Sequence, residues 1–423
     1  MDLLGRIRDE MAFEGNVWKS FVYRFLMNFQ LFWPIWVIYL QKERGLSLTQ
    51  ITVLDVPFFL VIVFAEIPTG AIADRFGRRV SLMLGSLMFS IAVFVFGIAE
   101  SYPIILLSYT AWGLGLTFQS GADAAILYDS LKTVGREDDF QKINSRLWAL
   151  TSVAVLVALL IGAPIAAATS FTLAIVLSAG ISLLAVPVAW SMHEPRAEHS
   201  KEHERYLQTV ITGVRDAWRQ PTLRYIIIFS GLLNAATFAP LIFVQPFLDQ
   251  HGVDTGNLGL WQAPVRGAGV IAALLVHQFV SRAGQRAAFF AMPAAIAVAM
   301  FALAGVDSLW VYVVFLGVGM VAGMQNPVLA SYVNRRIPSE RRATMLSVQS
   351  VIASFLLIGI EPLGGVLADQ FGLQAMFLAM GLIVAVFGTG VLLLWNRAET
   401  DALKAESGRE PAPERANEPV AVS

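Results

Sequence analysis

The dominant pattern in the chain is a series of long apolar runs separated by short polar segments. Each run is about 20 residues long, which is the length of helix that crosses the hydrocarbon core of a bilayer. Because a backbone surrounded by lipid must satisfy its own hydrogen bonds, such runs form helices. We therefore predict an all-α membrane protein with twelve transmembrane helices. The predicted spans are residues 21–40, 48–73, 80–99, 103–131, 143–168, 171–192, 223–248, 258–280, 287–304, 309–333, 343–368 and 371–395.

The basic residues predict the orientation of these spans. If the N-terminus is cytoplasmic, only Lys42 and Arg44 of the 30 lysines and arginines fall on the outer side. Arg24 and Arg266 fall within spans, and all the others lie on the inner side. Cytoplasmic loops of membrane proteins carry an excess of Lys and Arg. The sequence thus predicts two cytoplasmic termini and a multi-pass protein of the inner cell membrane.

The composition agrees with this class and limits the possible chemistry. The chain is 56% hydrophobic and 14% charged, and its mean hydropathy of +0.64 lies outside the range of soluble proteins. It has no cysteine, which excludes disulfides, thiol chemistry and cysteine-based metal sites. His199 and His203 have i, i+4 spacing, but they lie in a polar segment and we interpret them as solvated. We expect no metal site.

Weak internal repeats divide the predicted spans into two halves. The segment 74–79 has an echo at 281–286, and Pro164 has a counterpart in Pro362. Echoes in the same order, each about 200 residues apart, are typical of two six-helix halves in parallel repeat. The predicted parts are a cytoplasmic lead (1–20), an N-terminal half (21–192), a cytoplasmic linker (193–222), a C-terminal half (223–396) and a disordered cytoplasmic tail (397–423).

The most specific motif lies between the second and third predicted spans. Residues 70–79 read Gly-Ala-Ile-Ala-Asp-Arg-Phe-Gly-Arg-Arg, with one acid, two glycines and three arginines in a very short loop. This pattern, G-x-x-x-D-R-x-G-R-R, resembles the signature loop of the major facilitator superfamily, which joins the same two spans. The resemblance implies a secondary transporter in which two halves rock about a central site.

The same resemblance assigns roles at the inner gate. Asp74 is expected to face the start of span 11, since a helix N-terminus favours an anion. Arg78 is expected to pair with Asp129 at the cytoplasmic end of span 4. Gly70 and Gly77 are expected to permit close helix approach and a tight turn. The predicted gate residues are Gly70, Asp74, Arg75, Gly77, Arg78, Arg79 and Asp129.

Charged residues inside the apolar runs are candidates for ion coupling. Each costs a few kcal/mol at depth and therefore faces a cavity or a partner. An inner layer holds Arg24, Glu66, Asp123, Asp129 and Arg146, and an outer layer holds Asp55, Arg266 and Glu361. Two interpretations stay open: structural ion pairs at the gates, or proton exchange by one or two acids, with Glu66, Asp123 and Asp55 foremost. In the outer layer we expect Arg266 between or beside the two acids.

Two positions depart from the patterns of proton-coupled relatives. Tyr109 stands four residues before Gly113, where such members often have an arginine. The run 162–167 in span 5 keeps small residues but not the antiporter pattern. The resemblance therefore fixes neither proton coupling nor the direction of transport.

The substrate is indicated only by spans 1, 4, 7 and 10, which are expected to line the cavity. They carry aromatic and amide side chains and few charges, which suits a hydrophobic or amphipathic small molecule. The candidates are Gln30, Trp33, Trp36, Trp112, Gln119, Asn234, Phe238, Gln245, Gln325 and Asn326.

We predict a secondary transporter, not an enzyme, that exports such molecules in exchange for protons and uses no cofactor besides the proton gradient. No Walker-type phosphate loop is present, so ATP does not drive it directly. Two alternatives remain: an uptake symporter or facilitator for a nutrient or metabolite, and a non-transporting membrane receptor or scaffold. We expect a monomer in the lipid bilayer, with a small-molecule partner and no nucleic acid.

Overall fold

The computed structural model describes residues 3–194, 215, 218–336 and 339–407, and their side chains except at 3–12, 334–336, 339–347, 403 and 405–407. All regular secondary structure in these ranges is helical. The first group of helices comprises α1 (Leu3–Asn28), α2 (Trp36–Lys42), α3 (Leu48–Val53), α4 (Asp55–Phe76), α5 (Arg78–Ile98), α6 (Tyr102–Gln119), α7 (Ala122–Thr133), η1 (Glu137–Asp139), α8 (Phe140–Ala168), α9 (Phe171–Leu183) and α10 (Ala185–Ser191).

The second group follows the linker and has a similar series of long helices. A π-helical turn, η4, joins the last two helices of this group. The members of the group are α12 (Pro221–Phe238), α13 (Pro240–Gln250), η2 (Thr255–Asn257), α14 (Leu258–Ala283), α15 (Gln285–Gly305), η3 (Leu309–Val314), α16 (Phe315–Arg336), α17 (Ser339–Phe371), α18 (Leu373–Ile383), η4 (Val384–Gly388) and α19 (Thr389–Ser407).

Ten helical segments among the described residues are long and apolar enough to cross a membrane. They overlap every predicted span except 21–40 and 103–131, where the helices are interrupted. The first interruption separates α1 from α2 around Pro34, which has no backbone N–H to donate. The second lies at Gly121, whose φ of 74° falls in the left-handed region. The multi-pass membrane architecture is thus present, and the count of twelve spans stays a prediction.

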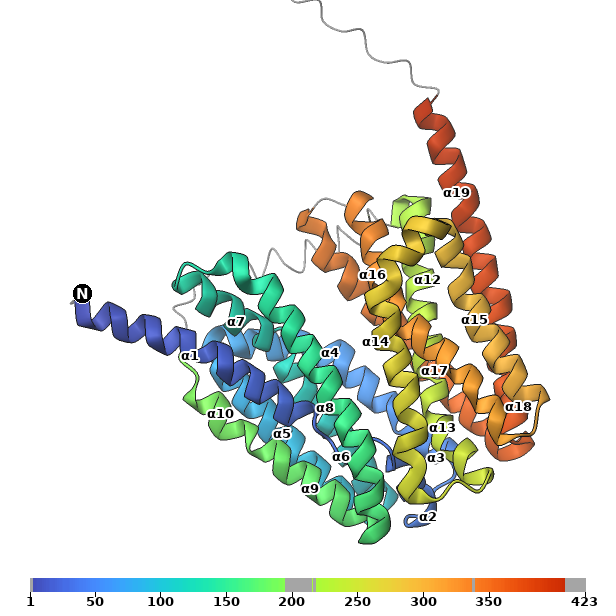
Figure 1. The fold of residues 1–423 in the computed structure, drawn as a ribbon, viewed down its shortest axis with the longest axis horizontal. Helices are drawn as coiled ribbons and strands as arrows, with labels where there is room; N and C mark the ends of the chain where they lie inside the picture. The colour runs from blue at the N-terminus through green and yellow to red at the C-terminus, as the bar shows by residue number, and fades with distance from the viewer. Residues whose placement is uncertain (1–2, 195–214, 216–217, 337–338, 408–423) are drawn as a thin grey trace, which may run out of the picture.

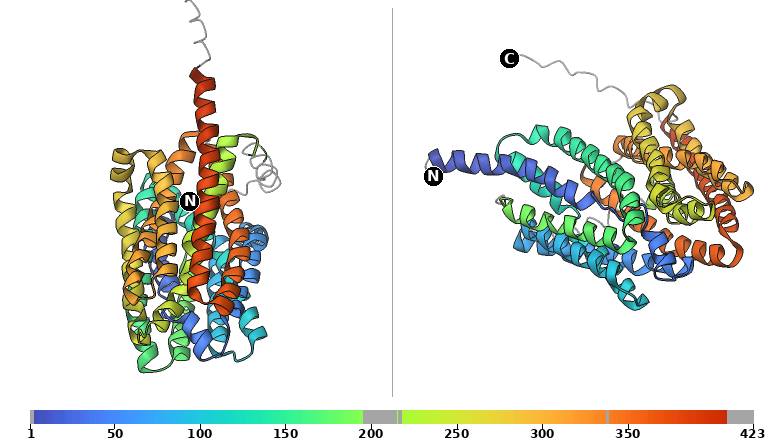
Figure 2. Two further views of the ribbon diagram at one scale, coloured as in Figure 1. Left: turned by 90° about the vertical axis from the view of Figure 1, so that its right-hand side faces the viewer. Right: turned by 60° about the horizontal axis from the view of Figure 1, so that its bottom comes forward.

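The helices form two groups that touch at one end and diverge toward the other. Figure 1 shows the blue-to-green helices on one side and the yellow-to-red helices on the other. In the left view of Figure 2 the long helices of both groups appear roughly parallel, whereas Figure 1 shows the first group inclined to the second. The N-terminus and the end of α19 both lie on the diverging side (Figure 1). We call the end where the groups touch the closed end, and the opposite one the open end.

Glycines let the two groups approach closely at the closed end. A Cβ added to Gly259 of α14 would lie 1.7 Å from the backbone oxygen of Leu159 in α8. A Cβ on Gly365 of α17 would lie 2.2 Å from Oγ1 of Thr52 in α3. The helix pairs α8–α14 and α3–α17 therefore pack backbone against backbone, as small residues permit in membrane proteins.

Candidate functional site

The loop between α4 and α5 is built around Gly77. This residue ends α4 with a φ of 98°, and a Cβ there would lie 2.9 Å from the carboxyl group of Glu194. That carboxylate accepts hydrogen bonds from the backbone N–H groups of Arg78 and Arg79, both at 2.8 Å. Glu194 thus satisfies the free N–H groups at the start of α5. Sequence reasoning missed Glu194, which lies more than 100 positions away in the chain.

The loop arginines contact neighbouring helices of the first group. Arg78 forms an ion pair with Asp129 of α7 and also donates to the backbone oxygen of Ala125 at 3.4 Å. Arg79 donates to the backbone oxygen of Met192 at 3.4 Å, and Arg75 lies over the ring of Phe76. The predicted partner of Asp74 is the start of span 11, whose side chains lie outside the described residues. The role of Asp74 at that helix stays a prediction.

Arg24 and Asp123 of the inner layer pair with each other. Arg24 of α1 contacts the carboxylate of Asp123 at 2.6 Å, and its guanidinium also lies over the ring of Trp148. Asp123 lies in the first turn of α7, directly after the break in span 4, where the helix N-terminus favours an anion. Glu66 is exposed and accepts a long hydrogen bond of 3.4 Å from Ser120.

The two outer-layer acids meet across the groups. Asp55 of α4 and Glu361 of α17 are 2% and 0% exposed, and their carboxyl groups interact. Tyr109 of α6 donates its hydroxyl to Asp55 at 2.9 Å, whereas no described residue donates to either oxygen of Glu361. Two deprotonated carboxylates offer only acceptors, so a hydrogen bond between them requires a proton on one of the two.

Arg266 takes no part in this acid pair, which corrects the expectation from the sequence. No described acid forms an ion pair or hydrogen bond with Arg266. Its positive charge does not compensate the negative charges of Asp55 and Glu361. Arg266 lies on α14, whereas the acids lie where α4 meets α17. The sequence predicted the depth of each charged residue in the membrane. It did not predict toward which neighbouring helix the charged side chain points.

A carboxylate from the second group caps the N-terminus of α3. Asp369, near the end of α17, accepts hydrogen bonds from the N–H of Leu48 at 3.0 Å and from the N–H and Oγ1 of Thr49 at 2.8 and 2.6 Å. Beside it, Lys42 of α2 pairs with Asp249 of α13 at 2.5 Å. We call the contact of Asp369 with α3 the clasp. It joins the two groups at the closed end.

Sequence reasoning also missed Asp369, although a signal for it was present. The pattern Gly-x-x-Ala-Asp-x-Phe-Gly occurs at residues 70–77, in the signature loop, and again at 365–372, around Asp369. Both copies end in a glycine with positive φ, 98° at Gly77 and 87° at Gly372. The first copy lies at the end of predicted span 2 and the second at the end of predicted span 11, so the two copies do not occupy equivalent positions in the six-span repeat. They are therefore not among the echoes spaced about 200 residues apart.

Half of the ten predicted cavity residues are buried in this structure, and their role in substrate binding stays a prediction. Gln245 accepts from the N–H groups of Val37 and Ile38 and donates to the oxygen of Trp33, so its amide serves the broken backbone before α2. The other buried candidates are Gln30, Trp36, Trp112 and Gln325. Those with accessible surface are Trp33, Gln119, Asn234, Phe238 and Asn326.

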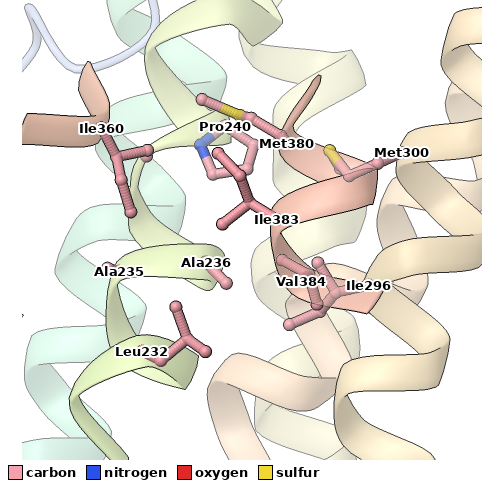
Figure 3. Close-up of a pocket in the computed structure, with 11 residues that line it drawn as sticks. Leu232, Ala235, Ala236, Pro240, Ile296, Met300, Ile360, Met380, Ile383 and Val384 are labelled. Carbon is pink, nitrogen blue, oxygen red and sulfur yellow. The ribbon is translucent and has the colours of Figure 1, made fainter. Parts of the chain in front are cut away.

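The second group also encloses a small cavity between α12, α15, α17 and α18 (Figure 3). The side chains of Leu232, Ile296, Met300 and Met380 point into it, and its volume of about 10 Å³ is no more than one water needs. An apolar lining of this size offers no place for an organic substrate. We regard it as a packing defect beside η4.

No group of three or more His, Asp or Glu side chains that could hold a metal ion occurs among the residues described here. His199 and His203, interpreted above as solvated, lie outside the described residues.

Comparison with known families decides the class. A family model described as Major Facilitator Superfamily matches residues 25–360, which is most of the chain. The chain belongs to the major facilitator superfamily. Members of this family are membrane transporters and not enzymes, so the protein is a multi-pass transporter that lies in lipid and takes a small-molecule substrate.

Relatives and solved structures extend over most of the chain. An MFS-type transporter of Bacillus subtilis, YxaM, is 22% identical over 84% of this chain and 89% of its own length. The multidrug efflux pump Tap of Mycolicibacterium fortuitum is 25% identical over 81% and 86%. The nucleoside transporter NupG has the same fold, with a TM-score of 0.73 at 14% identity over 92% and 98% of the two chains. A bacterial homologue of the lysosomal transporter Spinster, in an inward-facing and unoccupied conformation, gives 0.68 at 15% identity over 95% and 99%.

Proposed function

We propose that this transporter exports hydrophobic or amphipathic small molecules across the inner cell membrane by alternating access, in exchange for protons. Multidrug pumps among its relatives, at 24–25% identity, support the efflux direction. The basic residues support an orientation with the closed end outside. In that orientation the described state opens to the cytoplasm, where an exporter collects its substrate.

The acid pair of Asp55 and Glu361 carries the proposal of proton coupling. It is buried between the two groups at an interface that must separate when the closed end opens. Two ionised carboxylates in so dry a place repel each other, and no described cation compensates them. A proton held between them therefore favours the closed outer end, and its loss favours separation.

The direction of this effect agrees with exchange. A proton that arrives from outside would close the outer end and return the transporter to the state that collects substrate. Proton binding then favours the state with the closed outer end, whereas substrate is released from the state with the separated outer end. An exchanger requires such a difference in affinity between its two states. The inner-layer acids support coupling less well, because Asp123 pairs with Arg24 and Glu66 is exposed.

Flux measurements in proteoliposomes test the proposal. The purified protein is supplied with a chemically diverse panel of solutes, with and without an imposed pH gradient. We expect gradient-driven movement of amphipathic members, and we expect Glu361→Gln to lose this response by roughly tenfold or more while downhill exchange continues. The matched control is Asp307→Asn, since Asp307 contacts His251 and Gln374 within the second group only.

The possible outcomes separate the alternatives. A Glu361→Gln protein with an unchanged gradient response shows that the acid pair does not couple protons. Accumulation in the uptake direction supports a nutrient carrier, and absence of flux for every solute supports a receptor or scaffold.

A further inference from the structure

Arg266 is a charged side chain in a membrane-spanning helix that no described residue neutralises. It lies eight residues after the start of α14, within the candidate span Thr255–Ala283. The side chain is exposed in this state. A charge at such a depth normally faces a cavity or a partner.

The direction of Arg266 follows from the turn of α14. The lipid-facing side of this helix carries Leu260, Ile271 and Leu274, which are 61%, 58% and 76% exposed. At 3.6 residues per turn, Arg266 points about 120° away from Leu260 and only about 20° away from Gly259. Gly259 packs against α8 of the first group. Arg266 therefore faces the first group, two turns further toward the open end.

The facing side of α8 is accessible at the same depth. Leu159, which touches Gly259, is buried, but Ser152 and Trp148 on the same side of α8 are exposed. The two helices run in opposite directions, so Ser152, two turns before Leu159, lies level with Arg266. In Figure 1, α8 and α14 lie together at the closed end, and the groups separate beyond this point. The guanidinium thus stands where the space between the groups begins.

We propose that Arg266 binds an anionic group of the transported molecule, which makes the substrate an amphipathic organic anion. A guanidinium presents its donors in a planar fork that matches a carboxylate, sulfonate or phosphate. The indole of Trp148, on the facing side of α8, is contacted by Arg24 but is still 60% exposed, and it offers this accessible surface to the apolar part. The inference rests on the proposed transport function and adds the charge of its substrate.

Matched triples of ligands test this charge preference. Indole-3-acetate, indole-3-acetamide and tryptamine share one ring system and carry a carboxylate, a neutral amide and an ammonium group; benzoate and naphthoate triples extend the series. Binding is measured on protein in nanodiscs. We expect the wild type to prefer the carboxylate in at least one triple, and Arg266→Gln to lose roughly tenfold to a hundredfold of that affinity. Arg266→Lys should keep part of it, and Arg282→Gln, on the same helix, all of it.

A second measurement needs no variant. Phenylglyoxal modifies accessible arginines, and mass spectrometry reads the rate at each position. The preferred carboxylate should slow the reaction of Arg266 but not that of Arg282, and the matching amide should slow neither. Equal rates at Arg266 with and without the carboxylate would overturn the assignment.

The failure of this inference differs from the failure of the proposed function. If neutral or cationic members move with the pH gradient and Arg266→Gln transports them normally, the exporter stands and the anion site is removed. If carboxylates bind through Arg266 but no solute crosses the membrane, the site stands and transport is removed. A wild type that prefers the amide or amine in every triple also overturns the anion site.

Discussion

The clasp is expected to set the balance between the closed and separated states of the outer end, and Asp369→Asn tests this. The carboxylate accepts three hydrogen bonds from the first two residues of α3. Asparagine keeps one acceptor oxygen, but its NH₂ group would face an N–H or hydroxyl donor, and the negative charge at the helix start is lost. At least one of the three contacts must therefore break.

The size of the effect follows from these contacts. Hydrogen bonds to a charged group contribute about 1.5–3 kcal/mol each when they are shielded from water. Asp369 is exposed, so water replaces part of this loss, and the change resembles that of a removed helix cap, about 1–2 kcal/mol. This corresponds to a roughly 5- to 30-fold shift of the equilibrium toward the separated state.

The shift can be read as a distance between the groups. Because the chain has no cysteine, a pair introduced at Lys132 of α7 and Arg282 of α14 accepts spin labels without background labelling. Both positions are exposed, and they lie in different groups near the open end. Separation of the closed end should bring the labels together. We expect Asp369→Asn to increase the short-distance population in double electron–electron resonance by the stated factor.

Asp307→Asn is the control, since it removes an acid beyond α15 that contacts His251 and Gln374 of the second group. It should leave the distance distribution unchanged. If Asp369→Asn gives the same distribution as this control, the clasp does not hold the closed end.

Three further changes have expected outcomes in the first group or at its border. Glu194→Gln should lower the free energy of unfolding by about 1–2 kcal/mol, seen as a lower Tm in detergent, because two N–H groups of α5 lose their carboxylate. Arg24→Leu should destabilise more than Arg24→Leu with Asp123→Asn, since the single change leaves a partly buried acid alone; a double-mutant cycle of Tm values measures this. Gly259→Val should force α8 from α14 and reduce folded yield, because even one Cβ overlaps a backbone oxygen. Normal yield and a wild-type label distance in the Val variant would contradict that packing.

Much of the fold could be predicted from the sequence, because lipid allows few backbone arrangements. Apolar runs predicted the helical membrane class, and the loop motif predicted the family. The interruptions at Pro34 and Gly121 were not predicted, although a proline and a glycine stand there. Hydropathy is averaged over a whole apolar run, so a single residue that interrupts the helix does not stand out. Prolines such as Pro164 lie inside continuous helices in the same chain, so residue type alone does not locate a break.

The candidate site was less predictable because it depends on helix rotation and on distant partners. The contact of Arg78 with Asp129 follows the family pattern, and both partners lie at ends of predicted spans. The place of Arg266 and the use of Gln245 depend on which way a helix faces its neighbour in the other group. A single sequence gives the spacing within one helix but not the angle between two.

The repeated Gly-x-x-Ala-Asp-x-Phe-Gly pattern connects these contacts with alternating access. In the second copy, Gly365 packs against α3 and Asp369 receives the free N–H groups of that helix. In the first copy, a Cβ on Gly70 would meet no atom of the described residues within 4 Å, so Gly70 is not packed against another helix of the described part as Gly365 is. The chain passes from α3 into α4 in the direction opposite to α17, so the two copies lie at opposite ends of this helix pair. If α17 closes on Gly70 as it now does on α3 at Gly365, a rigid tilt of one group would engage one copy only by releasing the other. Asp369→Asn should then favour the state in which the first copy is engaged, and a distance between labels at positions 132 and 282 that lengthens in this variant would exclude this reciprocal arrangement.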